Sequence, residues 1–244
     1  MSNRLVRLTI ITDFACANCC IGQHELLDAI AYSQDVLHLP LSFHLEHMPF
    51  RLINPTLLNE NDPKKVDKCD FLLKHIGKER FAKLQAAISK WADEKGVPIS
   101  FRGVMSQTTR AHRLCQKAYQ IGGQNAQVPL LCAVFKAHME EGKDIADINV
   151  LADLAESTRT MTREQAIAFL ESDELEKEVN AMCDEAKSKG ITGVPMTIID
   201  GKWAVSGGQS KDVFVQIFKK LAAAGVHSAP SPFSGQSVDM GVCA

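Results

Sequence analysis

The sequence predicts an α/β fold in which a β-α-β unit and a β-β-α unit are separated by a long helical segment. Three observations indicate this order: an apolar, β-branched run precedes helical and then alternating periodicity near the N-terminus, residues 54–190 carry successive helical periods, and two short apolar runs precede an amphipathic stretch near residue 220. At 244 residues and 45% hydrophobic, the chain is long enough to bury a sizeable core.

The first unit begins with residues 5–12, LVRLTIIT, which are apolar and β-branched as in a buried parallel strand. From Ile21 onward the apolar residues Leu26, Leu27 and Ile30 recur at helical spacing. Residues 39–47, LPLSFHLEH, then alternate apolar and polar side chains, which indicates a second strand. Strand, helix and strand make a β-α-β start.

The middle of the chain reads as a series of helices interrupted at glycines. Thr162 and Gln165 have the spacing of a capping box, which marks the start of one of them. The predicted helices cover residues 63–76, 78–94, 108–121, 128–141, 147–156, 162–170 and 173–189. Residues 54–190 are therefore predicted to form an inserted, all-helical domain.

The closing unit comprises the runs MTIID and WAVSG, joined by a turn at Gly201-Lys202, and the amphipathic stretch SKDVFVQIFKKLAAAG. The assembled order is that of the thioredoxin fold with a large helical insertion. Residues 1–53 and 191–224 are predicted to form the thioredoxin-like domain. Residues 225–244 are rich in Ser, Pro and Gly and are predicted to be a flexible C-terminal tail.

Charge and hydropathy restrict the partners. Lys and Arg total 27 against 29 Asp and Glu, so no broad basic field indicates nucleic acid or an acidic membrane surface. The N-terminal apolar run is interrupted by Arg7 and lacks the h-region of a signal peptide, and no apolar stretch reaches 18 residues. We expect a cytoplasmic protein that acts on a small molecule or a protein thiol.

The cysteines of the first strand-helix junction carry the chemistry. Cys16 and Cys19 have CxxC spacing, which lets two thiols meet across the first turn of a helix. Helix N-H groups favour a thiolate there, so Cys16 is predicted to be the nucleophile and Cys19 the resolving thiol. The alternative is that Cys16 and Cys19 bind zinc. They would supply half of a four-ligand site, with His24, His44 or His47 as further ligands. Cys20 is interpreted as a helix-packing residue and Cys243 as incidental.

Three segments resemble the DsbA-like family, in its FrnE-like branch beside the 2-hydroxychromene-2-carboxylate isomerases and kappa-class glutathione transferases. They are DFACANCCIG, GITGVPMTIIDGKWAVSGGQSKDVF and TTRAHRL. The first is similar to the family's Asp-then-CPWC motif and the second to its GVP loop, hairpin and SGAQ-type helix start. The resemblance spans about residues 5–222. The dipeptide Ala17-Asn18 departs from the Pro-Trp common in the branch, which leaves the redox potential open.

The resemblance implies that Val194-Pro195 forms a cis peptide beside Cys16 and that substrate pairs with Val194 like an added strand. It also places the helix of His112 opposite the cysteines, where this histidine could hold substrate or assist proton transfer, or simply pack between domains. Ser206 and the Gly207-Gly208-Gln209 segment after it are expected to open the last helix, where their N-H groups could bind a carboxylate such as that of glutathione or simply turn and cap the helix. Arg110 and Arg113 are expected to be solvent-facing or salt-bridged.

The sequence thus predicts a thiol-disulfide oxidoreductase or isomerase with no bound cofactor and no metal. Its partners would be a disulfide or thiol substrate and glutathione as a redox partner, and a homodimer is compatible with this reading. Two alternatives stay open. One is a glutathione-dependent transferase or isomerase of small electrophiles, and the other is a non-catalytic binding module that uses the groove between core and insertion.

Overall fold

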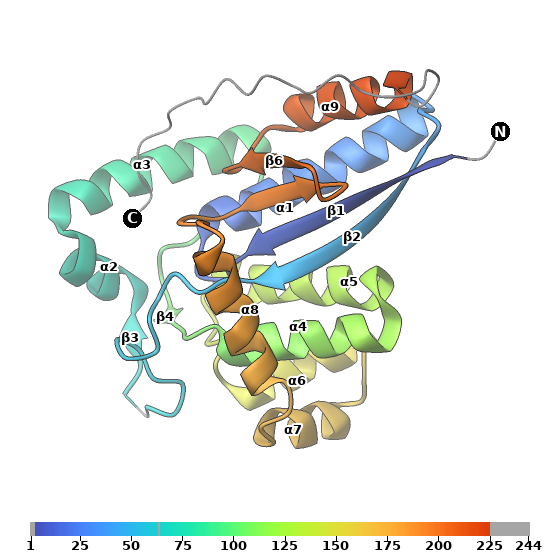
Figure 1. The fold of residues 1–244 in the computed structure, drawn as a ribbon. Helices are drawn as coiled ribbons and strands as arrows, with labels where there is room; N and C mark the ends of the chain where they lie inside the picture. Colours follow the sequence, from blue (N-terminus) through green and yellow to red (C-terminus); the bar gives the residue numbers. More distant parts are fainter. Residues whose placement is uncertain (1–2, 63, 225–244) are drawn as a thin grey trace.

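The computed structural model describes residues 3–62 and 64–224, and its elements follow the predicted order (Figure 1). Strand β1 (Arg4–Thr12), helix α1 (Ala17–Ala31) and strand β2 (Leu41–Pro49) form the first unit, with a π-helical turn, η1 (Tyr32–Val36), continuing α1. β1 and β2 are parallel and in register from Arg4 opposite Leu41 to Thr12 opposite Pro49. This pairing moves the second strand two residues beyond the predicted range.

The second unit completes a four-stranded sheet of order β2-β1-β5-β6. Strand β5 (Met196–Ile199) is antiparallel to β1, and β6 (Trp203–Ser206) is antiparallel to β5. Asp200 and Gly201 join them with φ of 51° and 68°, the left-handed pair that a tight hairpin requires. Helix α9 (Lys211–Ala224) closes the unit, so the thioredoxin order of strands and helices is confirmed.

Helices α1 and α9 lie together over one face of this sheet (Figure 1). Alternate residues of β1 and β2 pack against them, because successive strand side chains point to opposite faces. This core contains Val6, Leu8, Ile10, Leu26, Phe43, Leu45, Phe214 and Phe218, among others. Burying side chains of this size contributes about 1.5–3 kcal/mol each. The sheet and its two helices therefore hold the β1–α1 junction in a fixed frame.

The insertion is mostly helical, but it is not all-helical as predicted, because it also contains one short strand pair. Its helices are α2 (Lys68–Ile76), α3 (Lys78–Lys95), α4 (Thr109–Gly122), α5 (Gln124–Phe135) with the π-turn η2 (Lys136–Glu140), α6 (Ile148–Ser157), α7 (Arg163–Glu171) and α8 (Glu176–Ser188). Thr162 and Gln165 form the predicted capping box. The insertion also contains the paired strands β3 (Val66–Asp67) and β4 (Val104–Met105). Two-residue strands are too short for a periodicity to predict.

The first inserted helix starts later than residue 63. Asp67 is its N-cap, and the Asp67 carboxylate accepts hydrogen bonds from the backbone N-H groups of Cys69 and Asp70. An aspartate at this position satisfies donors that the first turn leaves unpaired. Residues 64–67 of the predicted helix consequently belong to a loop and to β3.

Glutamine side chains cover the outer edge of β2. Gln124 accepts from the N-H of Leu45 at 2.6 Å, and Gln127 accepts from the N-H of His47 at 2.9 Å. Gln116 donates to the carbonyl of His47 at 2.7 Å. These amides come from α4 and α5, which lie beside β2 in Figure 1, so the helices replace a missing neighbouring strand.

A second, larger core joins the cysteine junction to the helical insertion. It includes Ile11, Phe14 and Ile21 from the first unit and Leu114 and Leu131 from the insertion, all buried. The division into domains at residues 53, 190 and 224 stays a prediction, and the predicted tail 225–244 lies outside the described residues. Within residues 3–62 and 64–224, no helix is long and apolar enough to cross a membrane.

Candidate active site

The junction between β1 and α1 holds the two cysteines at the start of the helix. Cys16 is the N-cap residue, with an extended backbone (φ −101°, ψ 111°), and α1 begins at Ala17, so Cys16 lies at the helix N-terminus as the CxxC spacing predicted. The carbonyl of Cys16 accepts the N-H groups of Cys19 at 3.0 Å and Cys20 at 3.2 Å. This first helical turn brings Cys19 back over Cys16.

Cys16 is the outer cysteine of the pair. Its side chain is 9% exposed, against 2% for Cys19, and both are free thiols in the structure. The Sγ of Cys16 donates to the carbonyl oxygen of Val194 at 3.5 Å. The Val194-Pro195 peptide bond is cis, as the resemblance implied. The structure therefore brings Cys16, Cys19 and the Val194-Pro195 loop together from positions nearly 180 residues apart.

Cys19 is a protonated thiol at neutral pH. Burial raises its pKa well above the ordinary value, and the neighbouring Cys16 raises it further through a hydrogen bond and its charge. Hydrogen bonds from the Thr12 side chain and the Asp13 backbone act in the opposite direction. Because the two thiols differ in burial, different roles are favoured for them: the outer sulfur attacks a disulfide and the inner sulfur resolves the mixed disulfide.

Cys20 is a packing residue, as interpreted from the sequence. Its side chain is 1% exposed and lies in the larger core. Burial, followed by the charges of Glu140, Cys132 and Cys16, raises its pKa to about 12. A thiol with so high a pKa is inert in exchange at neutral pH.

His112 is buried rather than open to a bound substrate. It is 2% exposed, its Nε2 lies 3.4 Å from Oδ1 of Asp13, and its ring packs on Phe14 with centroids 4.9 Å apart. This placement favours the packing interpretation of His112 over direct contact with substrate. Asp13 connects it to the cysteine junction, since Asp13 lies three residues before Cys16.

Ser206 does not open the last helix. It is the exposed final residue of β6, and α9 begins five positions later at Lys211. The carboxylate of Glu25 accepts the N-H of Lys211 at 2.7 Å, so a side chain of α1 occupies the helix start that was expected to be free for a ligand. The residues after Ser206, Gly207 to Gln209, line a hollow together with Cys19.

A small, shallow hollow lies beside Cys19. Its lining includes Gln23, Pro195 and Thr197, with Gly207 and Gly208 from the loop before α9. Gly208 is constrained, because a Cβ there would lie 2.2 Å from the indole of Trp91 in α3. Trp91 is a wall of this region that the sequence analysis did not predict, since nothing in the helical pattern of α3 singles it out.

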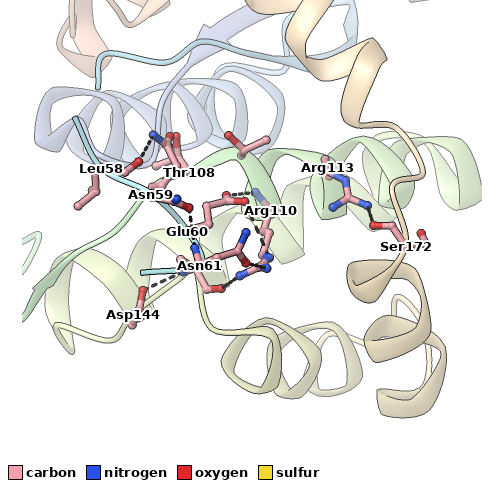
Figure 2. Close-up of polar contacts among 12 residues, drawn as sticks. Leu58, Asn59, Glu60, Asn61, Thr108, Arg110, Arg113, Asp144 and Ser172 are labelled. Atoms are coloured by element: carbon pink, nitrogen blue, oxygen red, sulfur yellow. Dashed lines mark hydrogen bonds and ion pairs between the residues drawn. The ribbon is translucent and has the colours of Figure 1, made fainter. Parts of the chain in front are cut away.

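Arg113, expected near the surface, is 4% exposed, and its guanidinium donates to the carbonyls of Ser172 at 2.6 Å and Glu174 at 2.8 Å (Figure 2). Arg110 is salt-bridged to Glu60, as expected. Across the part of the chain that the structure describes, no group of three or more His, Cys, Asp or Glu side chains is arranged to hold a metal ion.

The sheet order, the cysteine pair at the start of α1 and the cis-proline loop beside it define a thioredoxin-fold protein with a dithiol site. The chain belongs to the DSBA-like thioredoxin domain family, whose model matches residues 7–219. Members of this family are oxidoreductases or isomerases of thiols and disulfides, so the chain is an oxidoreductase-type enzyme. No curated protein sequence matches the chain.

Solved structures agree with this assignment. A probable DsbA oxidoreductase from Streptomyces coelicolor is 25% identical with a TM-score of 0.74, and the match covers 93% of each chain. The cytosolic disulfide reductase DsbM from Pseudomonas aeruginosa, solved with GSH, is 14% identical with a TM-score of 0.60, covering 89% of this chain and 99% of that one. A 2-hydroxychromene-2-carboxylate isomerase is 16% identical with a TM-score of 0.59, covering 90% and 95%.

Proposed function

We propose that this protein is a dithiol-disulfide oxidoreductase in which Cys16 attacks and Cys19 resolves. The observation that carries the proposal is the position of the Cys16 sulfur, 3.5 Å from the carbonyl oxygen of Val194 at the cis-proline loop and within hydrogen-bonding reach of Cys19. A substrate chain that pairs with Val194 would present its disulfide to this sulfur.

The exchange proceeds in two balanced steps. The Cys16 thiolate attacks one sulfur of the substrate disulfide, so one S–S bond breaks, a mixed disulfide forms and the other substrate sulfur leaves as a thiolate. Cys19 then loses its proton and attacks the sulfur of Cys16, which releases the second substrate thiolate and leaves a Cys16–Cys19 disulfide. The substrate is reduced by two electrons and the protein is oxidised by two.

Glutathione is the proposed redox partner, and no bound cofactor is needed. Two glutathione molecules reduce the Cys16–Cys19 disulfide and leave as glutathione disulfide, which closes the cycle. The similarity to a disulfide reductase solved with GSH supports this choice. That neighbour is described as cytosolic, which supports a cytoplasmic location and hence the reductase or isomerase direction.

Insulin reduction with glutathione as reductant tests the proposal. Cys16→Ser is expected to lose activity, and a Cys16–Cys19 disulfide should appear by mass spectrometry after oxidation. Cys183→Ser is the matched control, because Cys183 is also a buried free thiol whose pKa burial raises to about 11. Full activity of Cys16→Ser, or the absence of the disulfide, contradicts the proposal.

The glutathione-dependent transferase or isomerase ranks second, because such chemistry needs no resolving thiol and Cys19 is present beside Cys16. Cys19→Ala separates the two functions. Activity toward a chlorodinitrobenzene-type electrophile that survives Cys19→Ala, with insulin reduction absent in the unmodified protein, would reverse the ranking.

A further inference from the structure

We infer that Asp13, held in place by His112, is a positioning residue that fixes the two cysteines in the geometry for disulfide formation. The inference rests on the proposed dithiol chemistry and extends it to a carboxylate and an imidazole that touch neither sulfur with their side chains. Asp13 is fully buried and His112 is 2% exposed, so neither side chain is available to contact a substrate in solvent.

The backbone of Asp13 contacts both cysteines. Its carbonyl accepts the N-H of Cys16 at 3.1 Å, which fixes the residue at the helix N-cap. Its own N-H is hydrogen-bonded to the sulfur of Cys19. A displacement of Asp13 would therefore move the attacking and the resolving sulfur relative to one another.

The side chain of Asp13 fixes that backbone from three directions. Oδ1 accepts the N-H of Ala15 at 3.3 Å and lies 3.4 Å from Nε2 of His112, and Oδ2 accepts the N-H of Leu52 at 2.8 Å. These partners belong to the junction itself, to α4 and to the segment after β2. One carboxylate thus joins the cysteine junction to the helical insertion.

The carboxylate is ionised at neutral pH. Burial acts to raise its pKa, but the hydrogen bond and charge of His112, the N-H of Leu52 and the hydroxyl of Thr108 outweigh burial, and the pKa is lowered. Charge-assisted hydrogen bonds are stronger than neutral ones, so the ionised form holds the junction more rigidly than a neutral side chain would.

Rigidity has a redox consequence. Forming the Cys16–Cys19 disulfide from glutathione disulfide releases two glutathione thiols, and its second step depends on how often the Cys19 sulfur meets the sulfur of Cys16. A fixed junction keeps the two sulfurs together, which raises that frequency and stabilises the ring. A loosened junction would weaken the protein disulfide and let the mixed disulfide of Cys16 with glutathione persist.

Asp13→Asn tests this role at equilibrium with glutathione buffers. The asparagine amide can accept hydrogen bonds only at its oxygen. Its NH₂ group would face a group that donates to Asp13, so at least one charge-assisted hydrogen bond is lost. We expect the equilibrium constant for forming the protein disulfide to fall about tenfold, the size of one such bond, which corresponds to about 30 mV. Mass spectrometry should show the Cys16–glutathione mixed disulfide accumulating.

Asp144→Asn is the matched control. Asp144 is also a carboxylate with a lowered pKa and backbone, hydroxyl and cationic partners, but it lies in the insertion, where none of its hydrogen-bond or ion-pair partners is a cysteine. Its glutathione equilibrium should match that of the unmodified protein. An unchanged equilibrium in Asp13→Asn, or an equal shift in both variants, overturns the inference.

His112 gives a second, independent test that does not alter the junction. His112→Gln keeps a side-chain N-H that can donate to Asp13, whereas His112→Leu removes the donor. We expect the glutathione equilibrium to stay within about twofold for His112→Gln and to shift about tenfold for His112→Leu, with no additional shift when Asp13→Asn is combined with His112→Leu. Additive shifts contradict a shared role.

The outcomes for the inference and for the proposed function differ. If the unmodified protein forms no Cys16–Cys19 disulfide in any glutathione buffer, the dithiol function fails. If that disulfide forms in the unmodified protein and the Asp13 and His112 variants have the same glutathione equilibrium as Asp144→Asn, the positioning role fails while the function stands.

Discussion

Two aspartates, one fully buried and one half-buried, hold two different loops of this molecule by the same physical means. Asp13 accepts backbone N-H groups from Ala15 and Leu52 and faces His112. Asp144 accepts the N-H of Ala146 at 3.0 Å and the hydroxyl of Ser106 at 2.7 Å, and pairs with Lys65 at 2.6 Å. In both, hydrogen bonds and a cationic or imidazole partner lower the pKa against the effect of burial.

The two aspartates differ in access to water and in what their loops carry. The side chain of Asp13 is fully buried, whereas that of Asp144 is 12% exposed and its partner Lys65 is 47% exposed. Asp144 connects the β3–β4 pair to the segment before α6, and Asp13 connects the cysteine junction to the insertion. A hydrogen-bonded carboxylate thus fixes a loop at both places, and only the loop held by Asp13 carries the two cysteines.

The largest expected effect is the loss of stability when either carboxylate is removed. Asp13→Ala leaves buried donors and His112 without their acceptor, so the free energy of unfolding should fall by about 3–5 kcal/mol. Asp144→Ala should cost about 1–3 kcal/mol, because Lys65 can return to water. Urea denaturation followed by circular dichroism measures both. Equal losses would show that solvent access does not separate the two sites.

Two buried histidines, His47 and His138, predict a loss of stability in acid. Burial lowers the pKa of His47 in β2 and of His138 in η2 to about 4. The unfolded chain binds protons below about pH 6.5 while the folded one stays neutral, so stability falls as pH drops from about 6.5 to about 4, by about 3 kcal/mol per histidine.

Denaturation at pH 7 and pH 4.5 checks this sign. His47→Gln should remove close to half of the acid-dependent loss, since glutamine does not titrate. His44→Gln on the same strand is the control, because His44 is half-buried and hydrogen-bonded to Tyr119. A pH dependence that His47→Gln leaves unchanged would place the acid sensitivity elsewhere.

The smallest effect concerns two helix starts. The Cys16 side chain makes no capping hydrogen bond at α1, whereas Thr162 accepts the N-H of Gln165 at α7. Because serine is a better N-cap than cysteine, Cys16→Ser should stabilise the fold by up to about 1 kcal/mol while activity is lost, and Thr162→Ala should destabilise it by about 1 kcal/mol. Thermal unfolding measures both, and a destabilised Cys16→Ser would contradict the expected sign.

Local patterns predicted most of the fold. Short stretches of neighbouring residues were enough to predict three elements, and the structure has each close to its predicted position. They are the strand at residues 5–12, the capping box at Thr162 and the turn at Gly201. The predicted ends of helices and strands were wrong where an interaction with another residue sets the boundary. β2 extends to Pro49 because Thr12 pairs there, and α2 begins after Asp67 because that side chain caps it.

Only the cysteines and the GVP loop of the candidate site were predictable from the sequence. The spacing of Cys16 and Cys19 is visible in the sequence, and the GVP loop was found through resemblance. The hydrogen bond between Asp13 and His112 joins residues 99 positions apart, so no local pattern contains it. Ser206 was placed at a helix start because glycines follow it, whereas Glu25, from a distant helix, occupies that start.

The glutamines along β2 have a consequence for self-association. A bare strand edge offers its N-H and C=O groups to any extended chain, including a second copy of the same protein, and aggregates grow from such edges. Gln124 and Gln127 engage those groups of β2 with side-chain amides. Because these groups of β2 already have side-chain partners from α5, the insertion disfavours pairing of β2 with another extended chain.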